Sequence, residues 1–371
     1  MQTMKVSQPG LVSVMMPAYN AEAYIDRAIE SILGQSYPNW ELIIVNDGSN
    51  DRTVEKVSKF TDSRIKIFHQ KNSGEAAARN VALEHACGEF IAFLDADDLF
   101  LPDHLLAAVN YLQAHKGRDG VYSDGYYIDQ NGNQLKTLSS RRRGPFTGRV
   151  YEEVVRGSNV FGPPVCVVLR SNPIHQFNLI FDQNIIIGPD WDFFTQYADV
   201  AQFGYLDHIT CLYRVHMDNI SHRIGLQKRA LELAKCRINA IKMNSFNSCS
   251  VETRYAVFYD LLVNLLRGNP EKQTDITYWM EFQSLPEKVQ AKLLRLMASK
   301  THVYNMQSDQ GQYIKAWLRR SLKITPADWK VILLNVVYFI SPRFFGLLLR
   351  ARTYRQVDPM SIPPFADIYQ A

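Results

Sequence analysis

Cysteine and long apolar runs are both scarce in this sequence of 371 residues. The five cysteines are odd in number and no two have CxxC spacing, which argues against a disulfide framework or a thiolate zinc site. No run of about 18 consecutive apolar residues occurs, so we predict no transmembrane helix. Met1–Gly10 has one lysine and no apolar core, unlike a secretory signal. We therefore expect a reducing, cytoplasmic compartment.

Excess charge of one sign is also missing. There are 41 Lys and Arg residues against 37 Asp and Glu, a net charge of +4, which gives no support for a nucleic-acid partner. A hydrophobic content of 46% and a charged content of 21% are globular values and exclude wholesale disorder. The length predicts two domains, or one large domain with an appendage.

The first part of the chain alternates between apolar strands and helices. Short apolar runs predict buried strands at 11–16, 41–45, 65–68 and 90–94. Helical spacing of apolar residues predicts a helix over 21–35, and alanine-rich composition predicts one over 75–86. A cap at Asn50 or Asp51 predicts a short helix over 52–60, and Pro102 suits the first turn of a helix over 102–115. Buried strands that alternate with helices indicate a parallel α/β sheet. Ligands of such sheets bind beyond the carboxyl ends of the strands.

The pattern changes after residue 120. Asn131-Gly132 predicts a hairpin over 126–136, and an apolar run predicts a strand at 165–169. Arg141–Arg143 falls in a predicted loop, either as an anion-binding run or as a solvated one. From about 225 the chain is predicted to be helical, with segments near 226–243, 251–267, 286–298 and 311–322. We place the domain boundary near residue 222.

Three polar clusters follow the predicted strands, at 17–20, 46–49 and 95–98. Their convergence at one edge of the sheet predicts a nucleotide-type site. Asp95 and Asp97, separated by one residue, point to the same side of the chain and suit Mg²⁺ or Mn²⁺, which prefer oxygen ligands. The alternative is a cluster that caps the following helix.

Four further side chains each have a functional and a structural interpretation. Asp47 either accepts hydrogen bonds from a base or ribose, or closes its own loop as an Asx-turn. Arg79 either contacts a phosphate or pairs with an acidic neighbour. Asp190 follows Gly-Pro beside an aromatic residue, which suits a general base or a helix cap. His216 either completes a metal site or is merely hydrogen-bonded.

The order and spacing of these motifs resemble the family 2 glycosyltransferases of GT-A fold. The resemblance covers about residues 10–222 and rests on the stretches VSVMMPAYNAEAYIDRAIESILGQSYPNWELIIVNDGSNDRT, NSGEAAARNVAL, GEFIAFLDADD, GPDWDFF and LYRVHMDNIS. It implies an α/β catalytic domain over 1–222, with a Rossmann-like, mostly parallel sheet flanked by helices. Residues 223–371 would form a helical C-terminal region.

The resemblance also implies an activity. A sugar would pass with inversion from a nucleotide-diphosphate donor, favoured to be a UDP-sugar, to a hydroxyl of a glycan or lipid-linked acceptor. The positions that match the family's functional residues are Pro17, Tyr19 and Glu22 for the nucleotide pocket, Asp47 for the base, Arg79 for the nucleotide or its phosphates, Asp95 and Asp97 for the DxD motif, Asp190 for the general base, and His216 for metal or diphosphate. Among the DxD residues, Asp97 is favoured as the direct ligand of Mn²⁺ or Mg²⁺.

One departure leaves alternatives open. Pro189 occupies the place of the glutamate that usually precedes the family's base, which puts the loop geometry and acceptor preference in doubt, and Asp192 is the fallback base. A catalytically silent scaffold that binds sugar-nucleotides or glycans is the second hypothesis. A nucleotidyltransferase is the third, but it needs a glycine-rich basic loop after the first strand, and residues 17–20 are not one.

The segment 314–356 is strongly basic. It contains nine Lys and Arg residues against Asp328 alone, among many aromatic and aliphatic side chains. This composition predicts peripheral contact with an anionic membrane, at the inner face of the cell membrane, and would fit a lipid-linked acceptor. The alternative is a core-packing helical hairpin with a solvated basic face.

Overall fold

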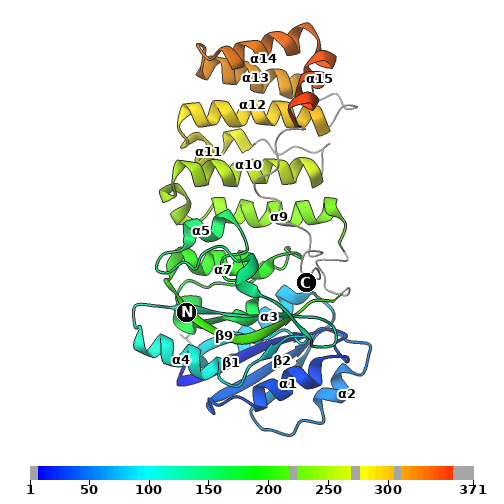
Figure 1. Cartoon of the computed structure of the whole chain (residues 1–371), viewed down its shortest axis with the longest axis vertical. Helices are drawn as coiled ribbons and strands as arrows, with labels where there is room; N and C mark the ends of the chain where they lie inside the picture. The colour runs from blue at the N-terminus through cyan, green and yellow to red at the C-terminus, as the bar shows by residue number, and fades with distance from the viewer. Residues whose placement is uncertain (1–6, 217–223, 269–275, 305–310, 354–371) are drawn as a thin grey trace. The chain divides into compact units, whose positions relative to one another are not determined.

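The computed structural model describes residues 7–216, 224–268, 276–304 and 311–353 (Figure 1). These residues fall into two compact units, with the division between Arg223 and Ile224. The predicted boundary near 222 lies outside the described residues. The same is true of the first six residues of Met1–Gly10 and of the last residues of the basic segment 314–356.

The N-terminal half of the sheet is parallel. Its strands are β1 (Gln8–Ala18), β2 (Trp40–Asn46), β3 (Ile65–His69) and β4 (Gly88–Phe93), in the spatial order β3-β2-β1-β4. Met15 of β1 pairs with Ile43 on one side and with Phe93 on the other. Every residue of β2 is buried, which explains why this central parallel strand is a continuous apolar run.

Four helices accompany these strands, as the sequence predicts, but with shorter bounds. They are α1 (Ile25–Leu33), α2 (Thr53–Val57), α3 (Glu75–His85) and α4 (His104–Ala114). α1 buries Ile25, Ala28, Ile29 and Ile32, the stripe expected of an amphipathic helix. α3 is alanine-rich and packs closely on β1 and β2, which brings its side chains to the carboxyl edge of the sheet.

The second half of the sheet mixes strand directions. β8 (Val167–Arg170) is antiparallel to β4, β6 (Gly120–Ile128) is antiparallel to β8, and β9 (Phe203–Arg214) is parallel to β6. β5 (Leu99–Phe100) and β7 (Gln134–Thr137) complete the sheet against β9 and β6. The β6–β7 pair confirms the predicted hairpin. The short helices of this region are η1 (Leu138–Arg141), α5 (Tyr151–Arg156), η2 (Pro164–Cys166), α6 (Ser171–Gln176) and α7 (Pro189–Val200).

In the described residues of the second unit, the regular elements are all helices. Its elements are α9 (Leu226–Ile241), η3 (Asn244–Ser248), α10 (Val251–Gly268), η4 (Ile276–Tyr278), α11 (Met280–Gln283), α12 (Glu287–Tyr304), α13 (Gly311–Ile324), α14 (Trp329–Ile340) and α15 (Pro342–Thr353). Within this unit the long helices stack in chain order (Figure 1). Among the described helices, none combines the length and the apolar character needed to cross a bilayer.

Candidate active site

The loops that follow β1 and β2 are bonded to each other at the carboxyl edge of the sheet. The backbone N–H of Asn20 donates to Ser49 Oγ at 3.0 Å, and the N–H of Asn50 donates to Asn20 Oδ1 at 2.8 Å. Pro17 lies in β1 beyond its last pairing with β4, where its missing N–H costs no bond to that strand. Tyr19 is 49% exposed beside it. Two of the three predicted polar clusters therefore form one connected rim.

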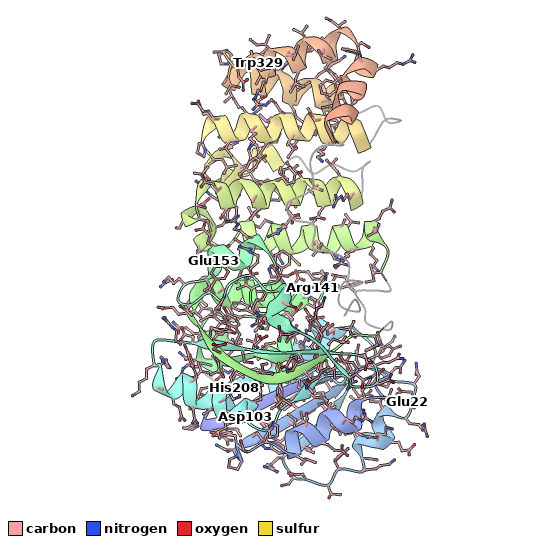
Figure 2. All side chains as sticks on the ribbon, in the orientation of Figure 1. Glu22, Asp103, Arg141, Glu153, His208 and Trp329 are labelled. Atoms are coloured by element: carbon pink, nitrogen blue, oxygen red, sulfur yellow. The ribbon has the colours of Figure 1, made fainter. Side chains whose placement is uncertain are left out.

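Glu22 extends this rim toward α2 rather than inward. Its carboxylate accepts from the backbone N–H of Arg52 at 3.0 Å and from Arg52 Nε at 3.3 Å, and these bonds lower its pKa. Both side chains of the pair are substantially exposed, and Figure 2 labels Glu22 at the surface of this unit. Exposed pairs of this kind contribute little to stability. In this structure Glu22 is engaged with Arg52.

Asp47 organises the neighbouring loop. Its Oδ1 accepts from the N–H of Ser73 and from Gln70 Nε2, both at 2.7 Å, and its Oδ2 accepts from the N–H of Gly74 at 2.9 Å. The side chain is 4% exposed. Gly48 follows with φ of 73°, and a Cβ there would lie 2.9 Å from the backbone nitrogen of Asn72, so this turn requires glycine. Asp47 therefore holds the entrance to α3 rather than its own Asx-turn.

Arg79 lies at the centre of the third cluster. Its guanidinium, 1% exposed, pairs with Asp95 Oδ1 at 2.7 Å and with Glu75 one helical turn earlier on α3. A charge buried to this extent requires such partners, because an unpaired guanidinium would lose its hydration without compensation. The acidic-pair interpretation of Arg79 is thus what the structure shows, and the pair ties α3 to the DxD motif.

The carboxylates around Arg79 have perturbed pKa values. Burial, together with the negative charges of Asp95, Asp190 and Asp97, raises the pKa of Glu75 to about 7, although Arg79 opposes the shift. Burial also raises the pKa of Asp95 against the same arginine. Perturbed carboxyls gathered at one edge of a sheet are a characteristic of functional sites. The influence of Asp190 on both groups places its charge in the same electrostatic neighbourhood.

The side chains of Asp97 and His216 are in contact. Asp97 Oδ2 lies 2.9 Å from His216 Nε2, and the side chains are 25% and 11% exposed. The imidazole lies against Tyr24, with ring centroids 5.2 Å apart. The structure thus brings together two predicted side chains that are 119 positions apart in the chain.

Behind this pair, Asp98 and Arg214 fix the backbone of the motif. Asp98, which is fully buried, accepts from the N–H of Arg214 at 2.8 Å, and Arg214 Nε donates to the carbonyl oxygen of Asp97 at 2.8 Å. Burial raises the pKa of Asp98 well above its usual range. The guanidinium of Arg214 also lies over Tyr24, 4.8 Å from the ring centroid. These contacts set the position of Asp97 relative to β9.

Asp190 stands in the first turn of α7. Gly188, at φ of 78° in the left-handed region, precedes the helix, and Pro189 is its first residue, a position where proline's missing N–H costs nothing. Pro189 is therefore accounted for by helix initiation. The fallback base Asp192 is 1% exposed and accepts from Gln196 Nε2 at 2.8 Å, which leaves Asp190 as the half-buried carboxylate of this turn.

An aromatic cluster joins α7 to the DxD strand. Phe93 at the end of β4 packs edge-on against Phe193 and Phe194, and Phe181 stacks on Phe193 with centroids 4.1 Å apart. The backbone of Phe181 exchanges two hydrogen bonds with the side chain of Asn80 on α3. This cluster relates the position of Asp190 to those of Asp95 and Asp97.

Three side chains of the site were missed in the sequence analysis, Tyr24, Glu75 and Arg214, and the role of Asp98 within the predicted cluster 95–98 was not predicted. The spacing of Glu75 and Arg79 by one helical turn was a visible signal for an ion pair. The Asp98–Arg214 and Tyr24–Arg214 contacts have no local signal, because the chain segments meet only in the folded sheet.

Arg142 differs from both interpretations of the basic run at 141–143. Its side chain is 3% exposed and donates to the carbonyl oxygens of Ser123 and Phe161, each at 2.8 Å. It also lies over the ring of Tyr122. The solvated-loop and anion-binding expectations are wrong for this residue, which anchors the loop after β7 to β6.

Comparison with known proteins identifies the family. Residues 13–176 match the family described as glycosyl transferase family 2. An uncharacterized glycosyltransferase of Methanocaldococcus jannaschii is 32% identical over 225 residues, which are 59% of this chain and 76% of that protein. The chain belongs to glycosyltransferase family 2. The resemblance of its motifs to this family is confirmed.

Other relatives match over a smaller share of their own length or of this chain. The UDP-Glc:alpha-D-GlcNAc-diphosphoundecaprenol beta-1,3-glucosyltransferase WfgD of Escherichia coli is 51% identical over 96 residues, 26% of this chain and 38% of that enzyme. Two uncharacterized Rickettsia glycosyltransferases match over 277 residues, and this chain spans only 43% and 44% of their lengths.

Solved structures support the architecture. The crystal structure of S. aureus TarS 1–349 in complex with UDP-GlcNAc superposes with a TM-score of 0.58, covers 94% of each chain and is 16% identical. At this identity the likeness speaks for the fold alone. It confirms the expected α/β, GT-A-type architecture with a helical C-terminal region, in which the sheet is parallel at one side and mixed at the other.

The site fits a divalent cation only in part. Within the described ranges, no three His, Cys, Asp or Glu side chains are arranged to enclose a metal. Asp97 and His216 nevertheless offer one carboxylate and one imidazole at a partly exposed position. Mg²⁺ in phosphate-processing sites is commonly held by one or two carboxylates together with substrate phosphates, so two protein ligands are compatible with such an ion.

Proposed function

We propose that the protein is an inverting glycosyltransferase that moves a sugar from a nucleotide-diphosphate donor to an acceptor hydroxyl. The observation that carries the proposal is the meeting of Arg79–Asp95 and Asp97–His216 at the carboxyl edge of the sheet, in electrostatic range of Asp190, in a chain of this family. We assign the transfer to residues 1–222 and regard 223–371 as a separate helical region.

The donor is proposed to be a UDP-sugar. TarS was crystallised with UDP-GlcNAc, and WfgD is named for UDP-Glc. In our proposal Pro17 and Tyr19 line the nucleotide pocket, with Glu22 at its outer rim. Asp47 contacts the base from the loop that it holds, because its Oδ2 accepts from the N–H of Gly74 and retains a second lone pair for a base N–H.

The diphosphate is proposed to lie near Asp97, His216 and Arg79. Asp97 and His216 would hold Mn²⁺ or Mg²⁺, and the bound ion would stabilise the negative charge of the departing diphosphate. Asp95 keeps the buried guanidinium of Arg79 in place, so that its positive charge is preorganised beneath the motif.

Asp190 is proposed as the general base. Its carboxylate takes the proton of the acceptor hydroxyl while the hydroxyl oxygen attacks the anomeric carbon from the face opposite the departing diphosphate. The new carbon–oxygen bond forms as the bond to the diphosphate breaks, and the leaving oxygen keeps the electron pair. A single displacement inverts the centre and requires no covalent nucleophile.

The acceptor is proposed to be a glycan or a lipid-linked sugar. Support comes from WfgD, whose name specifies a sugar on diphosphoundecaprenol. Such an acceptor would place the enzyme at the inner face of the cell membrane.

A panel of nucleotide-sugars, scored by nucleotide release with and without chelator, tests the proposal. We expect release from a UDP-sugar that needs Mn²⁺ or Mg²⁺ and is lost in Asp97→Ala. Asp103→Ala, an exposed aspartate just before α4, serves as the matched control and should retain release. Undiminished turnover in Asp97→Ala would refute the metal assignment, and nucleotide binding without product across a broad acceptor panel would favour a silent scaffold.

A further inference from the structure

The helix α14 is apolar on both of its faces, yet only one of them is covered. Val331, Asn335 and Tyr338 point into the unit and are at most 5% exposed, and the Asn335 amide donates to the carbonyl oxygen of Leu318 on α13. Such helices are normally buried all round. Among the described helices, α14 packs against α13 and α15, and the side chains on its opposite side are exposed.

The exposed side chains of α14, together with Phe344 of α15, make up what we call the α14 face. Its exposed large hydrophobic side chains are Trp329, Ile332, Leu333, Val336, Phe339 and Ile340, with Phe344 of α15 following them. Their spacing of three and four residues puts the α14 members on a single helical stripe. Trp329, labelled in Figure 2, is 65% exposed, and Ile340 is 79% exposed. Contiguous apolar surface of this kind marks an interaction site.

Positive charges border the α14 face. Arg319 of α13 lies 5.1 Å from the ring centroid of Phe339, Lys330 lies 5.7 Å from the ring of Trp329, and exposed Arg343 directly precedes Phe344. Between 311 and 346 the sequence has six basic residues and one acidic residue, Asp328. That carboxylate is occupied, since it caps α14 and lies 3.3 Å from Arg295 Nη1.

We propose that the α14 face is a docking surface for an anionic lipid bilayer. Aromatic and aliphatic side chains would enter the interfacial layer while the bordering basic side chains meet lipid phosphates. A second copy of this chain is the less favourable occupant, because pairing two such faces would bring their basic borders together. The proposal replaces the general membrane expectation for 314–356 with a defined face and is independent of the chemistry at Asp97 and Asp190.

The test is co-sedimentation of the full chain with vesicles. Vesicles of phosphatidylcholine containing phosphatidylglycerol should bind the protein, and binding should weaken with salt and with pure phosphatidylcholine. Val336→Glu, at an exposed position in the middle of the stripe, should lower the partition constant at least about tenfold, because it removes an inserted side chain and adds a repelled charge. Leu226→Glu, 85% exposed at the start of α9, is the matched control and should change it less than about twofold.

Three results would overturn the proposal. The first is equal binding of Val336→Glu and Leu226→Glu to the anionic vesicles, with helix content by circular dichroism unchanged in both. The second is a wild-type chain that ignores vesicles but dimerises, with Val336→Glu becoming monomeric. The third is vesicle binding that appears only after deletion of residues 354–371, since the chain would then cover its own face. Nucleotide release from a water-soluble donor should be equal in both variants and reports separately on the proposed function.

Discussion

The buried guanidinium of Arg79 offers a sharp test of how the site is held together. Arg79→Met keeps a long unbranched side chain of similar reach but removes the positive charge. Asp95 and Glu75 would then lose the cation that lies between them. Since Arg79 is 1% exposed, water cannot easily replace it.

The expected loss follows from the exposure of each partner. Removing one member of a fully buried ion pair costs about 3–5 kcal/mol. The carboxylates here are 25% and 31% exposed, so water compensates part of the loss, and we expect about 2–3 kcal/mol at pH 7. The cost should be smaller at pH 5. The pKa of Glu75 is already raised to about 7, and without Arg79 both carboxyls protonate more readily and need no cation.

Hydrogen exchange of peptides from α3 measures this directly. A loss of 2–3 kcal/mol corresponds to exchange about 30- to 150-fold faster than in the wild type at pH 7. Arg52→Met is the matched control, because Arg52 pairs with Glu22 in a substantially exposed ion pair and should cost less than about 1 kcal/mol. If Arg79→Met exchanged no faster than Arg52→Met, or lost as much at pH 5 as at pH 7, the electrostatic account of this cluster would be wrong.

Three further outcomes are expected. Asp190→Asn should reduce the rate of transfer by a factor of about 10²–10⁴, while calorimetry should show that donor binding is retained. Asp192→Asn should keep the rate of transfer, and the reverse pattern would assign the general base to Asp192. Asp47→Asn weakens three hydrogen bonds that hold the loop before α3, so donor affinity by calorimetry should fall about tenfold, and an unchanged affinity would separate this loop from the nucleotide pocket. Glu75 binds its proton more tightly in the folded state, so its contribution to the free energy of unfolding should fall by about 1–2 kcal/mol as pH rises from 4.5 to 7. Denaturant unfolding of the wild type and of Glu75→Gln over this range should show that fall in the difference between the two proteins, and a constant difference would place the shift elsewhere.

The parallel half of the fold was predictable from local pattern. β1, β2 and β4 are buried on both faces, so their sequences are short apolar runs that end where polar residues begin. Parallel strands present those ends at one edge, which is why the polar clusters after β1 and β2 lie together. The hairpin at β6–β7 followed from Asn131-Gly132 for an equally local reason.

The remaining features depend on contacts that sequence spacing does not encode. Nothing local indicates that β9 returns beside β6 and brings His216 to Asp97. Helical periodicity also fails to predict which face of α14 is buried, because apolar residues occur on both faces. The neighbours of Asn335 decide it, since its amide nitrogen donates to the carbonyl oxygen of Leu318 on α13 from the face that is buried.

The charges of the site explain what a diphosphate donor requires of it. Glu75, Asp95, Asp97 and Asp190 form a cluster of carboxyls, and the nearest arginine, Arg79, is already paired with two of them. A nucleotide diphosphate adds several negative charges to this neighbourhood, so its binding needs positive charge from outside the chain or protons taken up by the carboxyls. Glu75, whose pKa is raised to about 7, can take up such a proton at neutral pH. In our proposal a divalent cation held by Asp97 would supply the positive charge, and this is the physical reason to expect that the donor and the metal bind together.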